Sequence, residues 1–128
     1  LNPEAFYHRG YLYQMMGDFK NALNSYELII KISEHTTVKS TYEYAHIQQA
    51  YYNIGYINLL EGNYKQAIKM FDIAVNLNPA DANAIYNIGL CYEAIGDNKL
   101  AEEYYQTALQ ANPQHDEAAR SLGTLYKK

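Results

Sequence analysis

The chain has 128 residues, 48% of them hydrophobic and 19% charged, which is enough for one compact domain with a core and too short for two ordinary domains. Its formal net charge is −4 and it contains no block of Lys or Arg, so we expect no nucleic-acid partner. The longest apolar runs are a few residues, far short of the roughly 20 needed to cross a bilayer, so we expect a soluble domain without membrane insertion.

The single cysteine and the first residues bear on the cellular location. Cys91 cannot form an internal disulfide, which fits a reducing compartment. The opening Leu1-Asn2-Pro3-Glu4 has neither an initiator Met nor a signal-peptide pattern, so we expect this to be a piece of a longer protein. The sequence leaves localisation open and favours the cytoplasm without establishing it.

Helix start and stop signals divide the chain. Asn2 followed by Pro3 suits the start of a first helix, because Asn can cap a helix and proline is tolerated in its first turn. Glycine can then adopt the left-handed conformation that ends one helix, and a following Asp or Asn can cap the next. Such pairs occur three times, as Gly17-Asp18, Gly62-Asn63 and Gly96-Asp97. Each pair predicts a tight helical hairpin.

Two prolines indicate where helices end, and the sequence contains no strand signal. Pro79 and Pro113 end the second helices of two hairpins, because proline cannot continue a helix. No alternating β-branched run or Asn-Gly turn indicates a strand. We therefore predict helices throughout.

The segment after the first hairpin is longer than its counterparts. Gly10 and Gly55 are 45 residues apart, 11 more than the 34 between Gly55 and Gly89. Eleven residues make three helical turns with little drift. Ser40-Thr41-Tyr42-Glu43 has the form of a capping box, so we predict a long helix from about Thr41 to Glu61.

This long helix would make the hairpin over residues 18–61 project beyond its neighbours as a contact surface. Its core stripe is expected to hold Tyr44, Ile47, Tyr51 and Ile54, and its groove-facing stripe Tyr42, His46, Gln49, Asn53 and Tyr56. A polar loop over residues 33–40 without function is an equally supported alternative.

The tetrapeptide Tyr-Asn-Ile-Gly occurs twice, 34 residues apart, beginning at Tyr52 and Tyr86. Around it, Ala67 and Phe71 recur as Ala101 and Tyr105, and Pro79 recurs as Pro113. These residues resemble the tetratricopeptide repeat, a pattern of about 34 residues with Leu-Gly, an alanine, an aromatic four residues later, and a closing proline. The resemblance covers essentially the whole chain.

The resemblance implies a single all-α domain, a right-handed α-α superhelix of three helical hairpins plus a C-terminal helix. We expect repeats at 3–36, 48–81 and 82–115, an extended segment at 37–47, and a partial repeat or capping helix at 116–128. Gly55 and Gly89 would sit mid-helix, where glycine costs roughly 1 kcal/mol relative to alanine. That cost indicates a close crossing of two helices.

In this family the first helices line an inner groove, and the resemblance implies a protein-interaction module that binds a peptide or protein segment there. The expected groove residues are Tyr7, His8, Tyr11, Gln49, Tyr52, Asn53, Tyr56, Asn83, Tyr86, Asn87, Arg120 and Ser121, with Tyr42 and His46 as a possible extra contact surface. Asn can pair with a peptide amide through its donor and its acceptor, and Tyr offers an apolar face with a polar tip. The alternative, that Tyr52, Asn53, Tyr86 and Asn87 reflect the repeat consensus, has equal weight.

Chaperone-cofactor repeats of this family hold an acidic C-terminal peptide with two lysines, one arginine and two asparagines. In the first register Asn53 alone matches, and the other positions hold Tyr7, Tyr11, Asn83 and Asn87. One repeat along, the five positions hold Tyr52, Tyr56, Asn87, Glu117 and Ser121. Neither set can neutralise a pair of carboxylates, so we predict neutral or mildly basic, aromatic-tolerant partner segments.

Three functions remain open: a binding adaptor, scaffold or chaperone-like module, which is favoured; a self-associating module that dimerises through its first hairpin; and an accessory domain of a larger enzyme. We expect no intrinsic catalysis, cofactor or metal, since no phosphate loop, nucleophile elbow or metal-ligand spacing occurs. The four histidines, His8, His35, His46 and His115, are each expected to be solvated.

Overall fold

The computed structural model describes residues 2–35, 37 and 40–128, apart from the side chains of Thr41 and Tyr42. Its regular structure consists of α1 (Pro3–Met15), α2 (Phe19–Glu34), α3 (Thr41–Leu60), α4 (Tyr64–Leu77), α5 (Ala82–Ile95), α6 (Asn98–Ala111) and α7 (Asp116–Tyr126). No strand occurs in the part of the chain so described. The predicted all-α repeat array of three hairpins and a C-terminal helix is confirmed.

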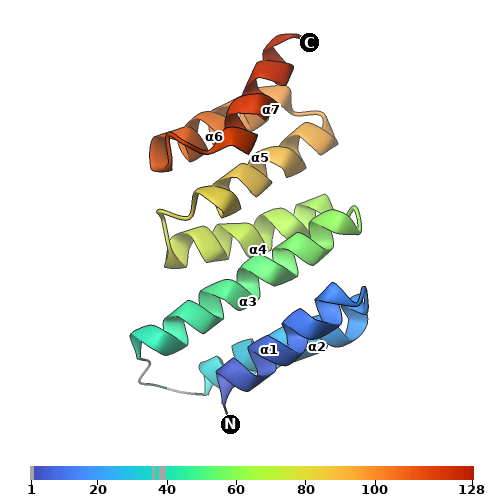
Figure 1. Ribbon diagram of the computed structural model, residues 1–128, viewed down its shortest axis with the longest axis vertical. Coiled ribbons are helices and arrows are strands. Elements are labelled where there is room, and N and C mark those ends of the chain that lie inside the picture. The colour runs from blue at the N-terminus through green and yellow to red at the C-terminus, as the bar shows by residue number, and fades with distance from the viewer. Residues whose placement is uncertain (1, 36, 38–39) are drawn as a thin grey trace.

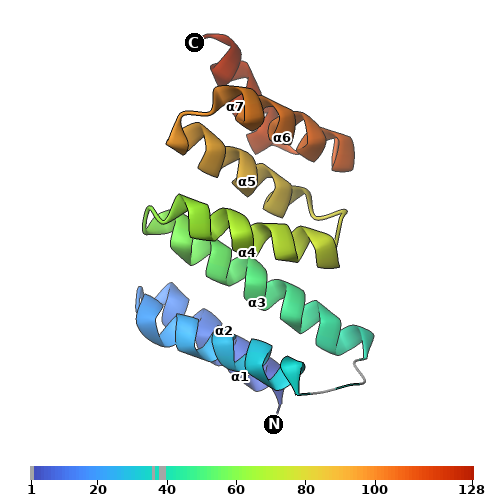
Figure 2. The same cartoon turned by 180° about the vertical axis from the view of Figure 1, so that it is seen from behind.

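The helices stack in chain order from the N-terminus to the C-terminus (Figure 1). The pairs α1/α2, α3/α4 and α5/α6 form antiparallel hairpins, and α7 packs on α6. The first helices of successive hairpins also touch, α1 with α3 and α3 with α5. Figure 2 shows the opposite side of the stack, to which α2, α4 and α6 contribute. The core consists of several clusters of buried hydrophobic side chains between neighbouring helices.

The hairpin turns follow the predicted punctuation. Gly17, Gly62 and Gly96 adopt φ values of 79°, 81° and 102°, the left-handed region that glycine enters without a steric penalty. Asp97 then accepts the backbone N–H of Leu100 at the start of α6. Asp18 caps α2 in the same way, whereas Asn63 makes no side-chain cap to α4. The three turns share a backbone shape and differ in their caps.

An aromatic ring lies over the mid-helix glycine of each hairpin. A Cβ atom on Gly89 would lie 2.6 Å from Cε1 of Tyr105, and one on Gly55 would lie 3.0 Å from the ring of Phe71. Gly10 faces Tyr26 in the same manner. The predicted close crossing is thus present, and the rings that require it are fully buried.

The additional residues of the second repeat extend α3 at its N-terminus. The helix has 20 residues, against 14 in α5, and the hydroxyl of Ser40 accepts the backbone N–H of Glu43. The predicted start at Thr41 is confirmed. Tyr44, expected in the core, is 49% exposed, because the buried stripe begins one turn later at Ile47.

Arg9 occupies a repeat position that Ile54 and Ile88 hold in the other hairpins. Its Nε donates to the hydroxyl of Ser25 at 3.3 Å, and its guanidinium lies 5.0 Å from the ring centroid of Phe6. Ser25 is buried. A polar contact and a cation–π contact thus replace the aliphatic packing at this position.

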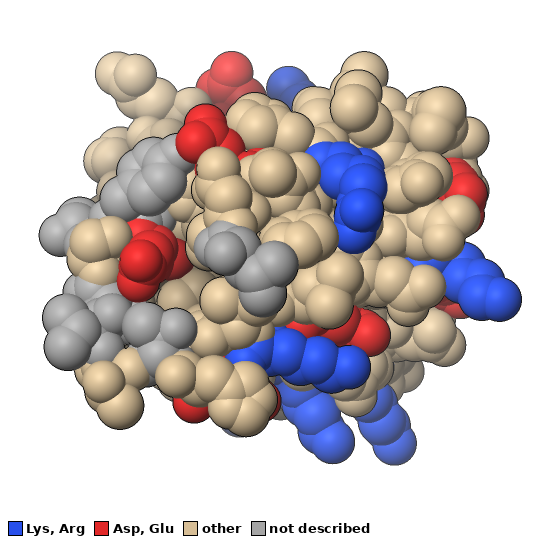
Figure 3. Space-filling model, turned by 90° about the horizontal axis from the view of Figure 1, so that it is seen from below, with Lys and Arg blue, Asp and Glu red and all other residues tan. Residues whose placement is uncertain are grey.

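Charged side chains are unevenly spread over the N-terminal end of the stack. Seen from that end, basic side chains lie mostly along the lower and right side of the view, and acidic ones are scattered among uncharged residues (Figure 3). Among the described helices none is long and apolar enough to span a bilayer.

Candidate functional site

The first helices of the repeats together line a central hollow of about 370 Å³. Tyr11 comes from α1, Tyr52 and Tyr56 from α3, Tyr86 from α5, and Glu117 from α7. A neighbouring hollow of about 290 Å³ lies between α1, α3 and the start of α5. The two hollows share residues of α3 and form the middle of an inner groove.

Most of the predicted groove residues line this groove. The central hollow and its neighbours contain Tyr7, Tyr11, Gln49, Tyr52, Asn53, Tyr56, Asn83, Tyr86, Asn87 and Arg120. His8 lines none of these hollows, and its ring lies 3.6 Å from the carboxylate of Glu4, one turn earlier on α1. The prediction for Tyr42 concerns a side chain outside the described residues.

Polar side chains link successive first helices across the groove floor. The amide of Asn87 donates to the hydroxyl of Tyr52 at 3.0 Å, and the amide of Asn53 donates to that of Tyr7 at 3.4 Å. The hydroxyl of Tyr86 lies 3.1 Å from that of Ser121 in the corresponding place. We call these three contacts the tyrosine ladder.

The ladder changes the interpretation of the two asparagines. Asn53 and Asn87 are only 8% and 5% exposed, and each has used an amide hydrogen on the preceding repeat. Burial without such a partner would be unfavourable for an amide. The repeated Tyr-Asn pair therefore joins repeats, and the more exposed Tyr11 and Tyr56 offer more surface for an external contact.

Tyrosine rings form roughly parallel pairs along α1 and α3. Tyr7 and Tyr11 stack with centroids 6.3 Å apart, and Tyr52 and Tyr56 with centroids 6.5 Å apart. Burial raises the pKa of Tyr52 above its ordinary value, and the nearby charges of Asp81 and Glu117 raise it further. The hydrogen bond from Asn87 lowers this pKa, but by less than burial raises it. The Tyr52 hydroxyl therefore stays protonated at neutral pH and can donate a hydrogen bond.

Two histidines differ from the expectation that each would be solvated. His46 is 8% exposed and meets the ring of Tyr7 edge-on, with centroids 6.0 Å apart, so it offers little contact surface. His115 is also buried; its Nδ1 accepts the backbone N–H of Ala118, and its Nε2 lies 2.7 Å from Oδ1 of Asn83. Both rings pack against residues of a neighbouring helix. The spacing of histidines along the sequence does not reveal such contacts.

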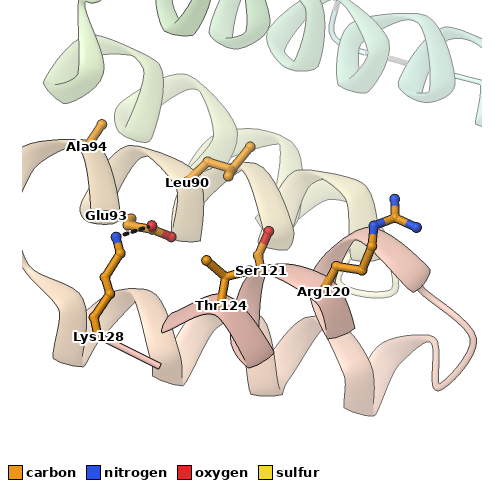
Figure 4. A pocket seen from close by; sticks show the side chains of 7 residues that line it. All are labelled: Leu90, Glu93, Ala94, Arg120, Ser121, Thr124 and Lys128. Carbon is orange, nitrogen blue, oxygen red and sulfur yellow. Dashed lines mark hydrogen bonds and ion pairs between the residues drawn. The ribbon is translucent and has the colours of Figure 1, made fainter. Parts of the chain in front are cut away.

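A further hollow of about 560 Å³ between α5 and α7 was not predicted (Figure 4). Leu90, Glu93 and Ala94 of α5 face Thr124 and Lys128 across it, beyond the predicted Arg120 and Ser121. Leu90 and Ala94 follow Tyr86 at successive four-residue steps, which is the signal that could have extended the predicted groove.

An ion pair closes one end of this hollow. Nζ of Lys128 lies 2.8 Å from Oε2 of Glu93, and the hydroxyl of Tyr105 donates to Oε1 at 2.7 Å. Partial burial opposes ionisation of Glu93, but these hydrogen bonds outweigh it and lower its pKa from the ordinary value. Arg120 lies at the opposite end (Figure 4).

Metal-ligand residues are not clustered in the described part of the chain. No group of three or more His, Cys, Asp or Glu residues could hold a metal ion there. Cys91 is buried in the core beside Ala67 and Phe71, and burial raises the pKa of its thiol to about 12. A thiol in that state is a poor nucleophile.

Family models match two stretches of the chain. A model described as tetratricopeptide repeat matches residues 52–116, and a second model with the same description matches residues 3–36. No curated protein matches the sequence.

Several solved structures have a similar fold. The crystal structure of MamA is 27% identical with a TM-score of 0.79, over 98% of this chain and 67% of that one. A MamA fragment from Desulfovibrio magneticus RS-1 is 25% identical with a TM-score of 0.79, over 97% of this chain and 64% of that one. The first TPR of Spaghetti (RPAP3), bound to the HSP90 peptide SRMEEVD, is 17% identical with a TM-score of 0.82, over 98% of this chain and 90% of that one. This chain thus spans about two thirds of the MamA chains.

Proposed function

The chain belongs to the tetratricopeptide repeat family of protein-interaction modules, and we propose that its inner groove binds an extended segment of a partner protein. The observation that carries this proposal is the central hollow, which side chains from α1, α3, α5 and α7 line together. Aromatic faces beside amide groups suit a peptide, since they can contact its side chains and its backbone.

The charges in the middle of the groove favour neutral or basic segments. Glu117 is the one charged residue among those that line the central hollow, and Asp81 is the one charged residue that lines its smaller neighbour. The RPAP3 domain is solved with an acidic peptide. An acidic segment would meet two carboxylates here, so we propose a different class of partner for this chain.

The groove can be tested with a displayed library of random peptides, selected on the folded domain. A variant with Tyr11→Ala and Tyr56→Ala should bind the selected peptides about tenfold less tightly, because two aromatic contact surfaces are lost. These residues are preferable to Asn53 and Asn87, whose replacement would break the tyrosine ladder.

A matched control replaces exposed tyrosines that line none of the hollows described above, with Tyr44→Ala and Tyr126→Ala. This control should keep the wild-type affinity. Equal affinity for the groove variant and the wild type, with both folded, would contradict the proposal.

Self-association is a second candidate that one observation favours. Leu12, Met15 and Met16 are exposed on the first hairpin, whereas Ile57, which occupies the repeat position of Leu12, is fully buried against the preceding hairpin. Exposed apolar clusters often mark interaction surfaces. Light scattering should then give a mass that rises with concentration and falls to the monomer in Leu12→Gln/Met16→Gln; a concentration-independent monomer would rule this candidate out.

A further inference from the structure

Four tyrosine rings and one carboxylate line the central hollow of the groove. The rings belong to Tyr11, Tyr52, Tyr56 and Tyr86, and the carboxylate belongs to Glu117. The faces of aromatic rings carry negative electrostatic potential, so they attract cations within about 6 Å of the ring centroid. A carboxylate at the same hollow adds a full negative charge.

None of the described residues neutralises the carboxylate of Glu117. It makes no ion pair or hydrogen bond with any of the described residues. Arg120, one turn along α7, shares an adjacent hollow with Glu117 without pairing with it. Glu117 therefore faces the groove with its charge available.

The other polar groups of the hollow are already partly committed. Asn53 and Asn87 donate to tyrosine hydroxyls, and Tyr86 pairs with Ser121. Asp81 lies close enough to Tyr52 for its charge, like that of Glu117, to raise the pKa of that hydroxyl beyond the effect of burial. Glu117 is thus the one formal charge in the described lining of the hollow, and no described residue pairs with it.

We infer that the central hollow is a subsite for a positively charged side chain, arginine or lysine, of the bound segment. This inference rests on the proposed groove function and specifies the chemistry that the groove recognises. A guanidinium group suits the site particularly well, because it can lie on a tyrosine face while donating to the carboxylate of Glu117.

Capped amino acids test the subsite without a known partner. N-acetylarginine methylamide and N-acetyllysine methylamide would be titrated into ¹⁵N-labelled protein, with N-acetylcitrulline methylamide as a neutral analogue of the arginine probe. Amides of Tyr56, Tyr86 and Glu117 should shift saturably with the cations. The citrulline probe should bind at least about fivefold more weakly, the size of a cation–π contact at a partly exposed site.

Two variants distinguish charge recognition from a general polar contact. Glu117→Gln should weaken the arginine probe severalfold and leave the citrulline probe unchanged. Glu27→Gln removes an exposed carboxylate from α2, which lies outside the groove. This variant should bind both the arginine probe and the citrulline probe with wild-type affinity. Tyr11→Leu, at a side chain that is 45% exposed, should weaken the arginine probe without unfolding the domain.

The outcomes separate this inference from the groove function. Equal affinity for the arginine and citrulline probes, or no saturable shift around the hollow, would overturn the cation subsite. If selected peptides bind the groove while the arginine probe does not, the subsite fails and the groove stands. If the probe binds the hollow but no peptide is selected, the subsite stands and the groove function fails.

Discussion

Glycine at one repeated position sets how closely the helices of each hairpin approach. Gly89 and Gly123 occupy this position in α5 and α7, but only Gly89 lies beneath a ring; nothing lies within 4 Å of a Cβ atom placed on Gly123. The two glycines therefore differ in packing while sharing their place in the repeat.

Alanine substitutions at these two glycines should have opposite effects on stability. Gly89→Ala should destabilise the domain, because overpacking against the buried Tyr105 costs about 1–3 kcal/mol and exceeds the roughly 1 kcal/mol gained in helix propensity. Gly123→Ala should stabilise it by up to about 1 kcal/mol. Urea unfolding measures both, and a stabilised Gly89→Ala would contradict the close packing described here.

The tyrosine ladder predicts energetic coupling between repeats. Tyr52→Phe leaves the buried amide of Asn87 without its acceptor and should destabilise the domain by about 1–3 kcal/mol. A double-mutant cycle with Asn87→Ala should give a coupling energy of at least about 0.5 kcal/mol. Additive effects would mean that the contact does not hold the repeats together.

Buried Cys91 predicts a loss of stability at high pH. Its thiol has a folded pKa of about 12 against an ordinary value of 9.0, so the unfolded chain releases this proton more readily. The stabilisation is complete below pH 9 and is lost as the pH rises from about 9 towards 12. Tyr26 and Tyr105, whose pKa values burial also raises, add to this loss above pH 10.

The contribution of the thiol can be isolated by replacing it. Urea midpoints measured across this pH range should fall more steeply for the wild type than for Cys91→Ala. Parallel slopes would contradict a raised thiol pKa.

Helix caps allow a prediction at the scale of the elements. Asp97 accepts a backbone N–H of α6, whereas Asn63, at the same place in the preceding hairpin, makes no such bond to α4. Asp97→Ala should therefore cost about 1 kcal/mol, and Asn63→Ala only a few tenths. Thermal unfolding of the two variants measures the difference, and equal losses would contradict it.

Helix ends could be predicted because local residues determine them. α4 ends at Leu77 and α6 at Ala111, each two residues before a proline, and α3 begins after the Ser40 cap. Side-chain burial was predicted less well, since it depends on neighbours from other repeats. Tyr44 lies on the same face of α3 as the buried residues that follow it. It is nevertheless exposed, because it belongs to the additional turns at the start of the helix.

At the scale of the molecule, the repeat spacing was sufficient to predict the array, and the resemblance to the repeat family implied an inner groove. Neither could separate the groove residues that join repeats from those that leave surface for a partner, because both lie on the same helix face. Asn53 and Asn87 needed the structure to be placed in the tyrosine ladder. The hollow beside Glu93 and Lys128 was missed because it lies beyond the repeated motif.

The most direct test of groove binding is a ¹H–¹⁵N shift map of the domain with a peptide selected from the library. We expect the largest shift changes on groove-facing residues of α1, α3, α5 and α7, including Tyr11, Tyr56 and Glu117. Changes confined to α2, α4 and α6, or to the exposed apolar side chains of the first hairpin, would contradict it and move the interaction to the outer surface.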